Sequence, residues 1–379
     1  MTGVRHQLAA YSPLTAGAAG AALLDAAGRA DPRDALAERL RARFGARHVA
    51  LCSSGTHALQ CALAGRAPVA LPAYACYDLA TAAVGAGVCV ALYDVDPLHL
   101  APDLASLERV LAAGARTVVV APLYGIPVDW AALERLAAAY GARLIEDAAQ
   151  GHGASWRGRA LGSLGEMSIL SFGRGKGWTG GGGGALLSRD PHADGPAGAP
   201  GVRAEAVAAA AVAAQIALGR PWLYGIPMAV PSLGLGRTVY HDPTPVRPMR
   251  RAAAALAART EAPADAEAAH RRASAAGMLA GLPAGLAIQL SPDASPGYLR
   301  LPLRIPGGIG ALRDPARARR LGAAPGYPTP LSELPALQGR LTGPERRWPG
   351  AASLARDLVT FPTHSRVTPA DRAELLRLL

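Results

Sequence analysis

Short apolar runs alternate with amphipathic stretches between about residues 34 and 190. The stretches at residues 104–113 and 130–140 repeat apolar positions at helical spacing, and the joins between segments are short. This alternation predicts a doubly wound α/β layer whose sheet is mainly parallel and buried. A helix is expected at residues 35–44 and another from residue 53. Strands are expected at residues 49–52, 69–71, 88–93, 117–121, 143–146 and 167–172.

The pattern changes after residue 190. Residues 191–200 form a Gly/Pro/Ala loop, and an alanine-rich helix is expected at residues 206–218. The remainder predicts a smaller α+β domain. We therefore divide the chain into a large α/β domain with an N-terminal helical segment at residues 1–245 and a small C-terminal α+β domain at residues 246–379. In the second part, helices are expected at residues 252–259, 264–282 and 369–378, and a strand at residues 298–305.

The composition favours a folded protein and restricts its partners. Half of the 379 residues are hydrophobic and 18% are charged, which allows a sizeable core. Of the 39 basic residues, 38 are arginine and one is lysine, and the chain has no asparagine, a bias that we attribute to a GC-rich genome. The net charge of +11 suits anionic small molecules. Because the arginines are scattered and form no aromatic-interleaved stripe, we interpret them as solvated surface and expect no nucleic-acid partner.

Cysteine spacing and hydropathy bear on metals and compartment. The four cysteines match neither paired zinc ligands nor a secreted disulfide framework, so we expect no metal site. The first residues lack the features of a signal peptide, and the alanine-rich helix is shorter than the roughly 20 residues of a bilayer span. A cytoplasmic protein without a transmembrane segment is expected. Peripheral membrane binding through residues 206–235 stays open as an alternative.

The single lysine, Lys176, is the strongest chemical signal. It lies in Ser171-Phe172-Gly173-Arg174-Gly175-Lys176, where arginine occupies the position two residues earlier. Positive charge alone did not require lysine in this chain. A lysine can lose its proton and form a Schiff base with an aldehyde, which an arginine cannot do. The alternative is a chance surface lysine.

Two other segments suit a phosphorylated pyridine. The apolar strand at residues 143–146 leads into Asp147, a carboxylate that could face a protonated ring nitrogen, with Gln150 near a ring hydroxyl. Asp147 could instead cap a helix. The turn Ser53-Ser54-Gly55-Thr56 lies where a strand becomes a helix, and backbone N–H groups there suit a phosphate. A plain helix cap is the alternative.

Together these segments resemble the DegT/DnrJ/EryC1/StrS family of pyridoxal phosphate-dependent sugar aminotransferases. The resemblance covers nearly the whole chain and is most specific in residues 50–188. Its motifs are Ser54-Gly55-Thr56-His57-Ala58-Leu59, Leu71-Pro72-Ala73-Tyr74, Tyr93-Asp94-Val95-Asp96, Leu123-Tyr124-Gly125, Glu146-Asp147-Ala148-Ala149-Gln150 and the lysine segment. Weaker matches are Gly234-Leu235-Gly236-Arg237-Thr238-Val239-Tyr240, Arg300-Leu301-Pro302 and Phe361-Pro362-Thr363-His364.

The resemblance implies the pyridoxal phosphate-dependent transferase fold of type I, like that of aspartate aminotransferase. It implies that Lys176 binds the cofactor covalently and moves the proton, and that Asp147 pairs with the pyridinium nitrogen. Gln150 would bond the phenolic oxygen, and Ser171 with the Gly55-Thr56 turn would hold the phosphate. An amino acid, commonly glutamate, would donate nitrogen to a nucleotide-linked keto sugar. The family's working unit is a homodimer with its sites at the interface.

The chain departs from the family pattern on the substrate side. Cys76 stands where relatives place an aromatic ring over the cofactor, so stacking would fall to Tyr77 or Tyr74. Gly182 replaces an acid, and without asparagine the partner subunit's Asn-Arg pair is incomplete. The arginines that could still serve are Arg237, Arg247 and Arg250.

We predict an aminotransferase of amino-sugar, polysaccharide or secondary-metabolite biosynthesis. One alternative keeps the cofactor but dehydrates a sugar. Another is a non-catalytic regulatory subunit with the same fold, which the changes at Cys76 and Gly182 motivate.

Overall fold

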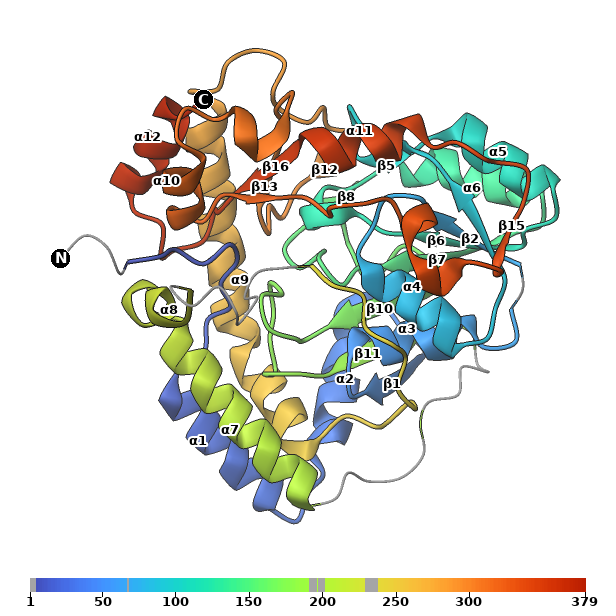
Figure 1. Ribbon diagram of the computed structural model, residues 1–379. Coiled ribbons are helices and arrows are strands. Elements are labelled where there is room, and N and C mark those ends of the chain that lie inside the picture. The colour runs from blue at the N-terminus through green and yellow to red at the C-terminus, as the bar shows by residue number, and fades with distance from the viewer. Residues whose placement is uncertain (1–4, 67, 191–195, 197–201, 229–237) are drawn as a thin grey trace.

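The computed structural model describes residues 5–66, 68–190, 196, 202–228 and 238–379. Its centre is an eight-stranded sheet with the order β1-β11-β10-β7-β6-β2-β3-β15 (Figure 1). Helices lie on both faces of this sheet. The strands are β1 (His48–Cys52), β2 (Val69–Pro72), β3 (Val90–Tyr93), β6 (Thr117–Val120), β7 (Arg143–Asp147), β10 (Met167–Ser171), β11 (Gly184–Ser188) and β15 (Leu341–Thr342).

The sheet is mainly parallel, as the apolar runs predict. Only β11 runs against its neighbours, since it pairs antiparallel with both β1 and β10. The connection between β10 and β11 spans residues 172–183 and contains no helix. A parallel return needs a crossover, usually a helix, so this short connection brings β11 back antiparallel. Sequence analysis did not predict β11.

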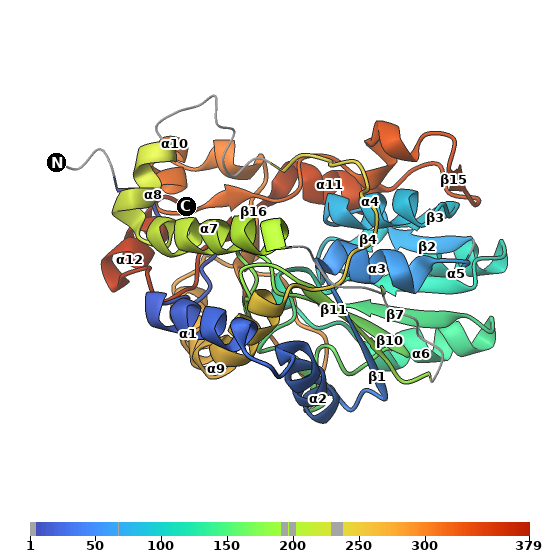
Figure 2. The same ribbon diagram turned by 90° about the horizontal axis from the view of Figure 1, so that it is seen from below.

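Alternating residues of each strand face opposite layers of helices. Val69 and Leu71 pack in the hydrophobic core that includes α3 and α4, whereas Ala70 packs in the core that includes α2, α5 and α6. Figure 2 shows α2 at the β1 end of the sheet, where the two elements are in contact. The helices of these layers are α2 (Pro32–Phe44), α3 (Gly55–Leu63), α4 (Tyr77–Gly85), α5 (Leu104–Ala112) and α6 (Trp130–Ala139).

A long helix, α9 (Arg251–Leu279), runs along one side of the molecule (Figure 1). The two separate helices expected at residues 252–259 and 264–282 are wrong, because the helix continues through Pro263. Proline removes one helical hydrogen bond. Packing against α1 (Ala16–Ala27) and α2, together with burial of Ala264 and Ala268, holds the helix together.

A second, three-stranded sheet lies beside the end of α9. It has the order β13-β16-β14 and packs with α10 and α12 around a separate hydrophobic core. The division of the chain at residues 245 and 246 stays a prediction.

The remaining elements are β13 (Leu301–Arg304), β14 (Ala324–Pro325), β16 (Leu358–Phe361), α7 (Val202–Leu218), α8 (Pro221–Met228), α10 (Pro315–Arg320), α11 (Pro349–Asp357) and α12 (Pro369–Arg377), with short strands β4 (Val95–Asp96), β5 (Ala101–Pro102), β8 (Ser155–Trp156), β9 (Arg159–Ala160) and β12 (Ala294–Ser295).

None of the helices in the described part of the chain combines the length and apolar character that a membrane crossing requires. The predicted loop at residues 191–200 lies outside the described residues except for residue 196. The same holds for residues 229–235 of the proposed membrane-binding segment.

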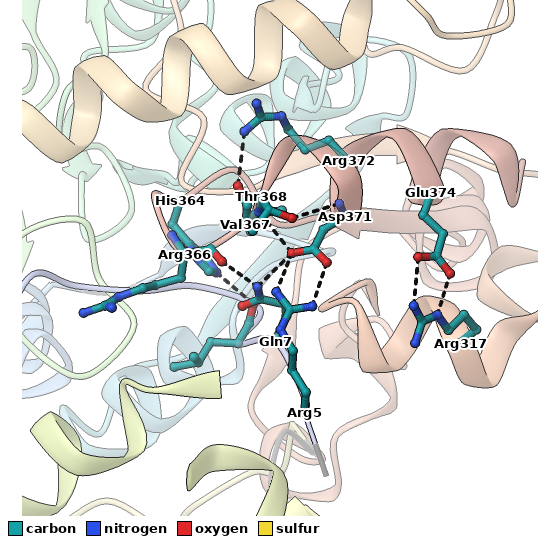
Figure 3. Close-up of polar contacts among 11 residues, drawn as sticks. Arg5, Gln7, Arg317, His364, Arg366, Val367, Thr368, Asp371, Arg372 and Glu374 are labelled. Atoms are coloured by element: carbon teal, nitrogen blue, oxygen red, sulfur yellow. Dashed lines mark hydrogen bonds and ion pairs between the residues drawn. The ribbon is translucent and has the colours of Figure 1, made fainter. Parts of the chain in front are cut away.

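The first described residues are fastened to the C-terminal helix (Figure 3). Arg5 donates from both terminal nitrogens to the two carboxylate oxygens of Asp371, each at 2.7 Å. The Gln7 amide also donates to Asp371, at 3.1 Å. His364 Nε2 donates to the Leu8 carbonyl at 2.9 Å. The N-terminal segment is therefore held against α12. A few residues later, Ser12 donates to the carbonyl of Lys176, on the loop between β10 and β11.

The buried side chain of His364 should make the stability of the protein depend on pH. Burial lowers the pKa of His364 from 6.5 to about 4, and its neutral form fits both the Leu8 carbonyl and the Arg366 N–H. A depressed histidine pKa stabilises the fold above pH 6.5, and this contribution is lost as the pH falls toward 4. As the pH falls from 6.5 to 5, the neutral His364 should cost the wild-type protein about 1.4 kcal/mol of its free energy of unfolding per pH unit. In His364→Gln, this part of the pH dependence should be absent.

Urea unfolding at several pH values measures this slope. The exposed His270 on α9 supplies the control, and His270→Gln should keep the wild-type profile. An unchanged slope in His364→Gln would contradict the assignment.

Candidate active site

The site forms where three parallel strands end. Strands β1 and β10 both run antiparallel to β11 and so parallel to each other, and β10 runs parallel to β7. Their carboxyl ends therefore share one edge of the sheet, the edge at which ligands gather in α/β folds. β7 ends at Asp147 and β10 at Ser171, while Gly184 at the start of β11 pairs with both Cys52 and Ser171.

The turn between β1 and α3 packs directly on the end of β10. A Cβ added to Gly55 would lie 2.8 Å from the Ser171 Cβ, so only glycine permits this approach. Ser54 caps α3, since its hydroxyl accepts from the His57 N–H at 3.0 Å. The helix cap named as the alternative for this turn is therefore present. The N–H groups of Gly55 and Thr56, in the first turn, have no intrahelical partner.

Two hydroxyls add to these backbone donors. The side chains of Thr56 and Ser171 have no hydrogen-bond partner among the described residues, and both are only partly buried. Together with the dipole of α3, this group of donors forms an anion cradle, which we define as Gly55, Thr56 and Ser171.

Asp147 lies partly buried at the end of β7. One of its carboxylate oxygens accepts from the Ala149 N–H at 3.1 Å. No helix follows, so the alternative of a helix cap is wrong. Burial raises the pKa of Asp147, and the charge of Lys176 and the Ala149 N–H partly offset this effect.

Lys176 lies on the loop between β10 and β11. Its backbone N–H donates to Gly173 at 3.3 Å, and Ser12 from the N-terminal segment donates to its carbonyl. The lysine side chain makes no hydrogen bond or ion pair with any described residue. Its charge acts on the carboxylate of Asp147 and on the thiol of Cys76. Side chains from three distant segments therefore lie within electrostatic range of one another.

The thiol of Cys76 is protonated at neutral pH. It donates to the Asp78 carboxylate at 3.4 Å. Burial, with a smaller contribution from Asp78, raises the pKa of Cys76 to about 12. The thiol is therefore a small neutral group beside Lys176 and Asp147, not a nucleophile.

The tyrosines near Cys76 are held by a segment of the C-terminal half. The Tyr74 hydroxyl accepts from the Tyr327 N–H at 2.8 Å, and the Tyr77 hydroxyl shares a hydrogen bond of 2.7 Å with Thr329. The rings of Tyr77 and Tyr327 lie 6.3 Å apart with their planes tilted by 35°. Only 1% of the surface of Tyr74 is exposed.

Gln150 is bonded on both sides. Its amide oxygen accepts from the Tyr124 N–H, and its amide nitrogen donates to the Tyr327 hydroxyl, both at 2.8 Å. Tyr327 therefore belongs to the site, and sequence analysis missed it. The neighbouring Gly326 is the one feature of the local sequence that could have pointed to Tyr327, because a side chain at position 326 would collide with the Tyr74 hydroxyl.

The substrate-side positions are only partly described. Arg237 lies outside the described residues, as does most of the motif at residues 234–240. The Arg247 carbonyl accepts from the Ser53 N–H at 2.8 Å, which places the chain around Arg247 and Arg250 beside the anion cradle. A Cβ at Gly182 would meet open space. In the described part of the chain, no three His, Cys, Asp or Glu side chains gather as metal ligands.

Residues 28–197 match the model of the DegT/DnrJ/EryC1/StrS aminotransferase family. Among curated relatives, the L-glutamine:2-deoxy-scyllo-inosose aminotransferase of Streptoalloteichus tenebrarius is 36% identical over 149 residues, covering 38% of this chain and 35% of the relative. A UDP-N-acetyl-3-dehydro-alpha-D-glucosamine 3-aminotransferase of Acidithiobacillus ferrooxidans is 32% identical over 133 residues, covering 34% of this chain and 36% of the relative. The chain thus spans little more than a third of the length of either curated relative.

The structural likeness extends much further than the sequence likeness. DesV of S. venezuelae, solved with a ketimine intermediate, superposes with a TM-score of 0.72 at 25% identity, over 96% of this chain and 92% of DesV. This likeness confirms the expected fold class, the pyridoxal phosphate-dependent transferase fold of type I with a mainly parallel central sheet.

Proposed function

Because this chain belongs to the DegT/DnrJ/EryC1/StrS aminotransferase family, which its residues 28–197 match, we propose that it is a pyridoxal phosphate-dependent aminotransferase. The amino group moves from an amino acid donor, L-glutamate, to a keto sugar, which we propose to be nucleotide-linked. The product serves amino-sugar, polysaccharide or secondary-metabolite biosynthesis. The working unit is a cytoplasmic homodimer with its sites at the interface.

One observation carries this proposal. The only lysine of the chain makes no ion pair or hydrogen bond with described residues, and its charge acts on an acid at the end of a neighbouring strand. The anion cradle of Gly55, Thr56 and Ser171 lies at the same edge of the sheet. An amine, an acid and an anion cradle together match the aldehyde, ring nitrogen and phosphate of pyridoxal phosphate, so the residues fit this cofactor.

The roles of the residues follow from their chemistry. Bound pyridoxal phosphate supplies an electron sink for the carbon that bears the amino group. Lys176 holds the aldehyde carbon and moves a proton to and from substrate carbon through its Nζ atom. Asp147, as a carboxylate, keeps a proton on the ring nitrogen. These two are the proposed catalytic residues.

Other residues hold the cofactor without moving protons. Gly55, Thr56 and Ser171 bind the phosphate, and Gln150 binds the phenolic oxygen with its amide. We propose that Tyr77 borders the ring, with its hydroxyl fixed by Thr329. Cys76 leaves more space than an aromatic residue would at its position.

The name of the Streptoalloteichus relative supports transfer to a cyclic ketone, and that of the Acidithiobacillus relative supports a nucleotide-linked sugar. The donor named for the first of them is L-glutamine. The donor test therefore compares L-glutamate with L-glutamine directly.

A visible absorption spectrum tests the proposal. Purified protein mixed with pyridoxal phosphate should become yellow, and L-glutamate, tested beside L-glutamine, should bleach the colour as the amino group transfers. Adding nucleotide-linked keto sugars one at a time should restore the colour with the true acceptor. A coloured protein that ignores every amino donor would reject transamination and favour a dehydratase. A protein that stays colourless would favour the non-catalytic subunit.

Substitution of Gly55 by alanine should weaken cofactor binding. The added Cβ would lie 2.8 Å from the Ser171 Cβ and 3.1 Å from its hydroxyl oxygen, which separates α3 from β10. Overpacking of this kind typically costs 1–3 kcal/mol, so we expect a loss of affinity of roughly 5- to 150-fold. Titration of the apoprotein with pyridoxal phosphate measures the change.

A matched glycine supplies the control for that substitution. A Cβ at Gly277 of α9 meets nothing within 4 Å, so Gly277→Ala should keep the wild-type affinity. Equal affinities for Gly55→Ala and wild type would reject the anion cradle as the phosphate site.

A further inference from the structure

Lys176 lies on a stretch of backbone that is held only weakly by its own residues. This stretch, residues 173–177, contains three glycines, and we call it the lysine loop. Gly175 has a φ of 75°, and the Lys176 N–H donates to the Gly173 carbonyl at 3.3 Å. Because glycine has more backbone freedom than any other residue, one such bond leaves several conformations open. The position of Lys176 therefore depends on contacts from outside the loop.

Those contacts come from the N-terminal strap, which we define as residues 5–12. The hydroxyl of Ser12 donates to the Lys176 carbonyl. Among the described residues, it makes the one hydrogen bond that reaches the lysine loop from elsewhere in the chain. A Cβ added at Gly175 would also lie 3.9 Å from the Cβ of Ala10. The end of the strap therefore lies along the lysine loop.

The beginning of the strap is fixed to α10 and α12. Arg5 bonds to α12 through both of its terminal nitrogens (Figure 3). Gln7 is fully buried, and its N–H donates to the Arg320 carbonyl at the end of α10, at 2.8 Å. The Leu8 carbonyl packs so closely on Gly322 that a Cβ there would lie 2.7 Å from its oxygen. These contacts tie the first half of the strap to the helices around the second sheet.

Tyr11 fixes the strap immediately before Ser12. Its hydroxyl accepts from Arg366 at 3.3 Å, and the guanidinium of Arg366 lies over its ring, 5.0 Å from the centre. The ring of His364 lies 5.9 Å from the Tyr11 ring. Because only three residues separate Leu8 from Ser12, the chain has little slack with which to absorb a movement of its anchor.

We propose that Ser12 is a positioning residue for Lys176, and that the N-terminal strap sets the place of the lysine loop from its anchor on α12. Held in this way, the amine of Lys176 can reach first the cofactor and then the substrate carbon without a search among loop conformations. Ser12 itself moves no proton. This inference rests on the proposed function for the reaction of the amine.

Hydrogen–deuterium exchange of the apoprotein tests the strap without cofactor or reaction. In Ser12→Ala, the amides of the lysine loop should exchange roughly 2- to 10-fold faster than in wild type, as expected for the loss of one hydrogen bond. Ser12→Thr keeps the hydroxyl and should exchange like wild type. Ser353 donates to Asp357 on the same helix, α11, at 3.3 Å, so Ser353→Ala removes a serine hydrogen bond elsewhere and should leave this exchange unchanged.

The far end of the strap supplies a second variant. Arg5→Gln should also speed exchange of the lysine loop, although Arg5 is bonded to α12. Combining it with Ser12→Ala should add nothing, because the anchor then has no bond through which to act on the loop.

Arg317 provides the matched control for Arg5. It forms the same kind of pair with Glu374 of α12, at 2.5 and 2.8 Å, without involving the strap (Figure 3). Arg317→Gln should therefore leave exchange of the lysine loop unchanged. An effect as large as that of Arg5→Gln would mean that any loosening of α12 moves the loop, and it would overturn the role of the strap.

The bleaching assay adds a readout that a loss of stability alone would not produce. In protein loaded with pyridoxal phosphate, Ser12→Ala should lower the bleaching rate at saturating donor about tenfold or more and leave KM nearly unchanged, because a displaced amine slows the chemistry more than the binding. Ser12→Thr should restore the rate. Unchanged exchange and an unchanged rate in Ser12→Ala would overturn the inference.

These outcomes separate the inference from the proposed function. If exchange of the lysine loop depends on Ser12 and Arg5 but no amino donor bleaches the colour, the strap stands and the proposed reaction fails. If donors bleach the colour equally fast in Ser12→Ala and wild type, the proposed reaction stands and Ser12 is not a positioning residue.

Discussion

Replacing Lys176 with arginine is expected to abolish the covalent attachment of pyridoxal phosphate and to lower transamination at least about a thousandfold. Arginine keeps the positive charge beside Asp147 and Cys76, but its guanidinium cannot lose a proton to attack an aldehyde. The substitution therefore removes the reactive amine and keeps the positive charge, so the loss of rate measures what the amine contributes. Borohydride reduction followed by peptide mass spectrometry measures the attachment, and the bleaching assay measures the rate.

Arg174 supplies the matched control on the same loop. It is exposed, and its side chain makes no hydrogen bond or ion pair among the described residues. Arg174→Gln should retain both the reducible adduct and the colour. A Lys176→Arg protein that transaminates at the wild-type rate would remove the basis of the proposed function.

Replacing Asp147 with asparagine is expected to leave the covalent attachment intact while slowing transamination about 100- to 1,000-fold, the usual loss when one electrostatic stabiliser is removed. Asparagine has nearly the same shape and can still accept from the Ala149 N–H. It cannot stabilise a proton on the ring nitrogen, so the electron sink is weakened. Single-turnover bleaching with L-glutamate measures the rate.

The pH profile adds a second readout for the same substitution. Burial raises the pKa of Asp147, so the carboxylate is lost at a higher pH than for an exposed aspartate. Activity should therefore fall on the acid side in wild type, and this limb should be missing from Asp147→Asn. Asp78 is exposed and also acts on Asp147, so Asp78→Asn serves as the control, with a change of less than about threefold. A full-rate Asp147→Asn protein would exclude the assigned role.

The pattern of apolar runs predicted most of the central sheet. Strands β2, β6, β7 and β10 begin within one residue of their expected positions, because each is short, apolar and bounded by polar joins. The antiparallel return of β11 was not predicted, since the glycine-rich connection before it gives no sign of strand direction. The helix break expected near Pro263 was also wrong, because packing on α1 and α2 outweighs the loss of one hydrogen bond.

Residue chemistry predicted which residues form the cofactor side of the candidate site, and the family resemblance supplied their individual roles. A single lysine among arginines, an acid at a strand end and a glycine-containing turn are local signals, and parallel strands necessarily bring their carboxyl ends to one edge. Tertiary structure alone decided the partners of those residues. Tyr327 reaches Gln150 across 177 positions of sequence, and Ser12 reaches the Lys176 carbonyl across 164.

The guanidinium of Arg300, which makes no hydrogen bond or ion pair with any described residue, likewise became visible only in three dimensions. In the sequence it is one of 38 arginines, and the weak family match Arg300-Leu301-Pro302 gives no sign of what surrounds its side chain. Its lack of a partner depends on which side chains the fold places around it, and those come from the segments that carry Tyr74, Tyr124, Tyr224 and Tyr327. Local sequence thus determined which groups can react, whereas long-range packing decided what surrounds them, because burial and pairing are properties of distant segments brought into contact.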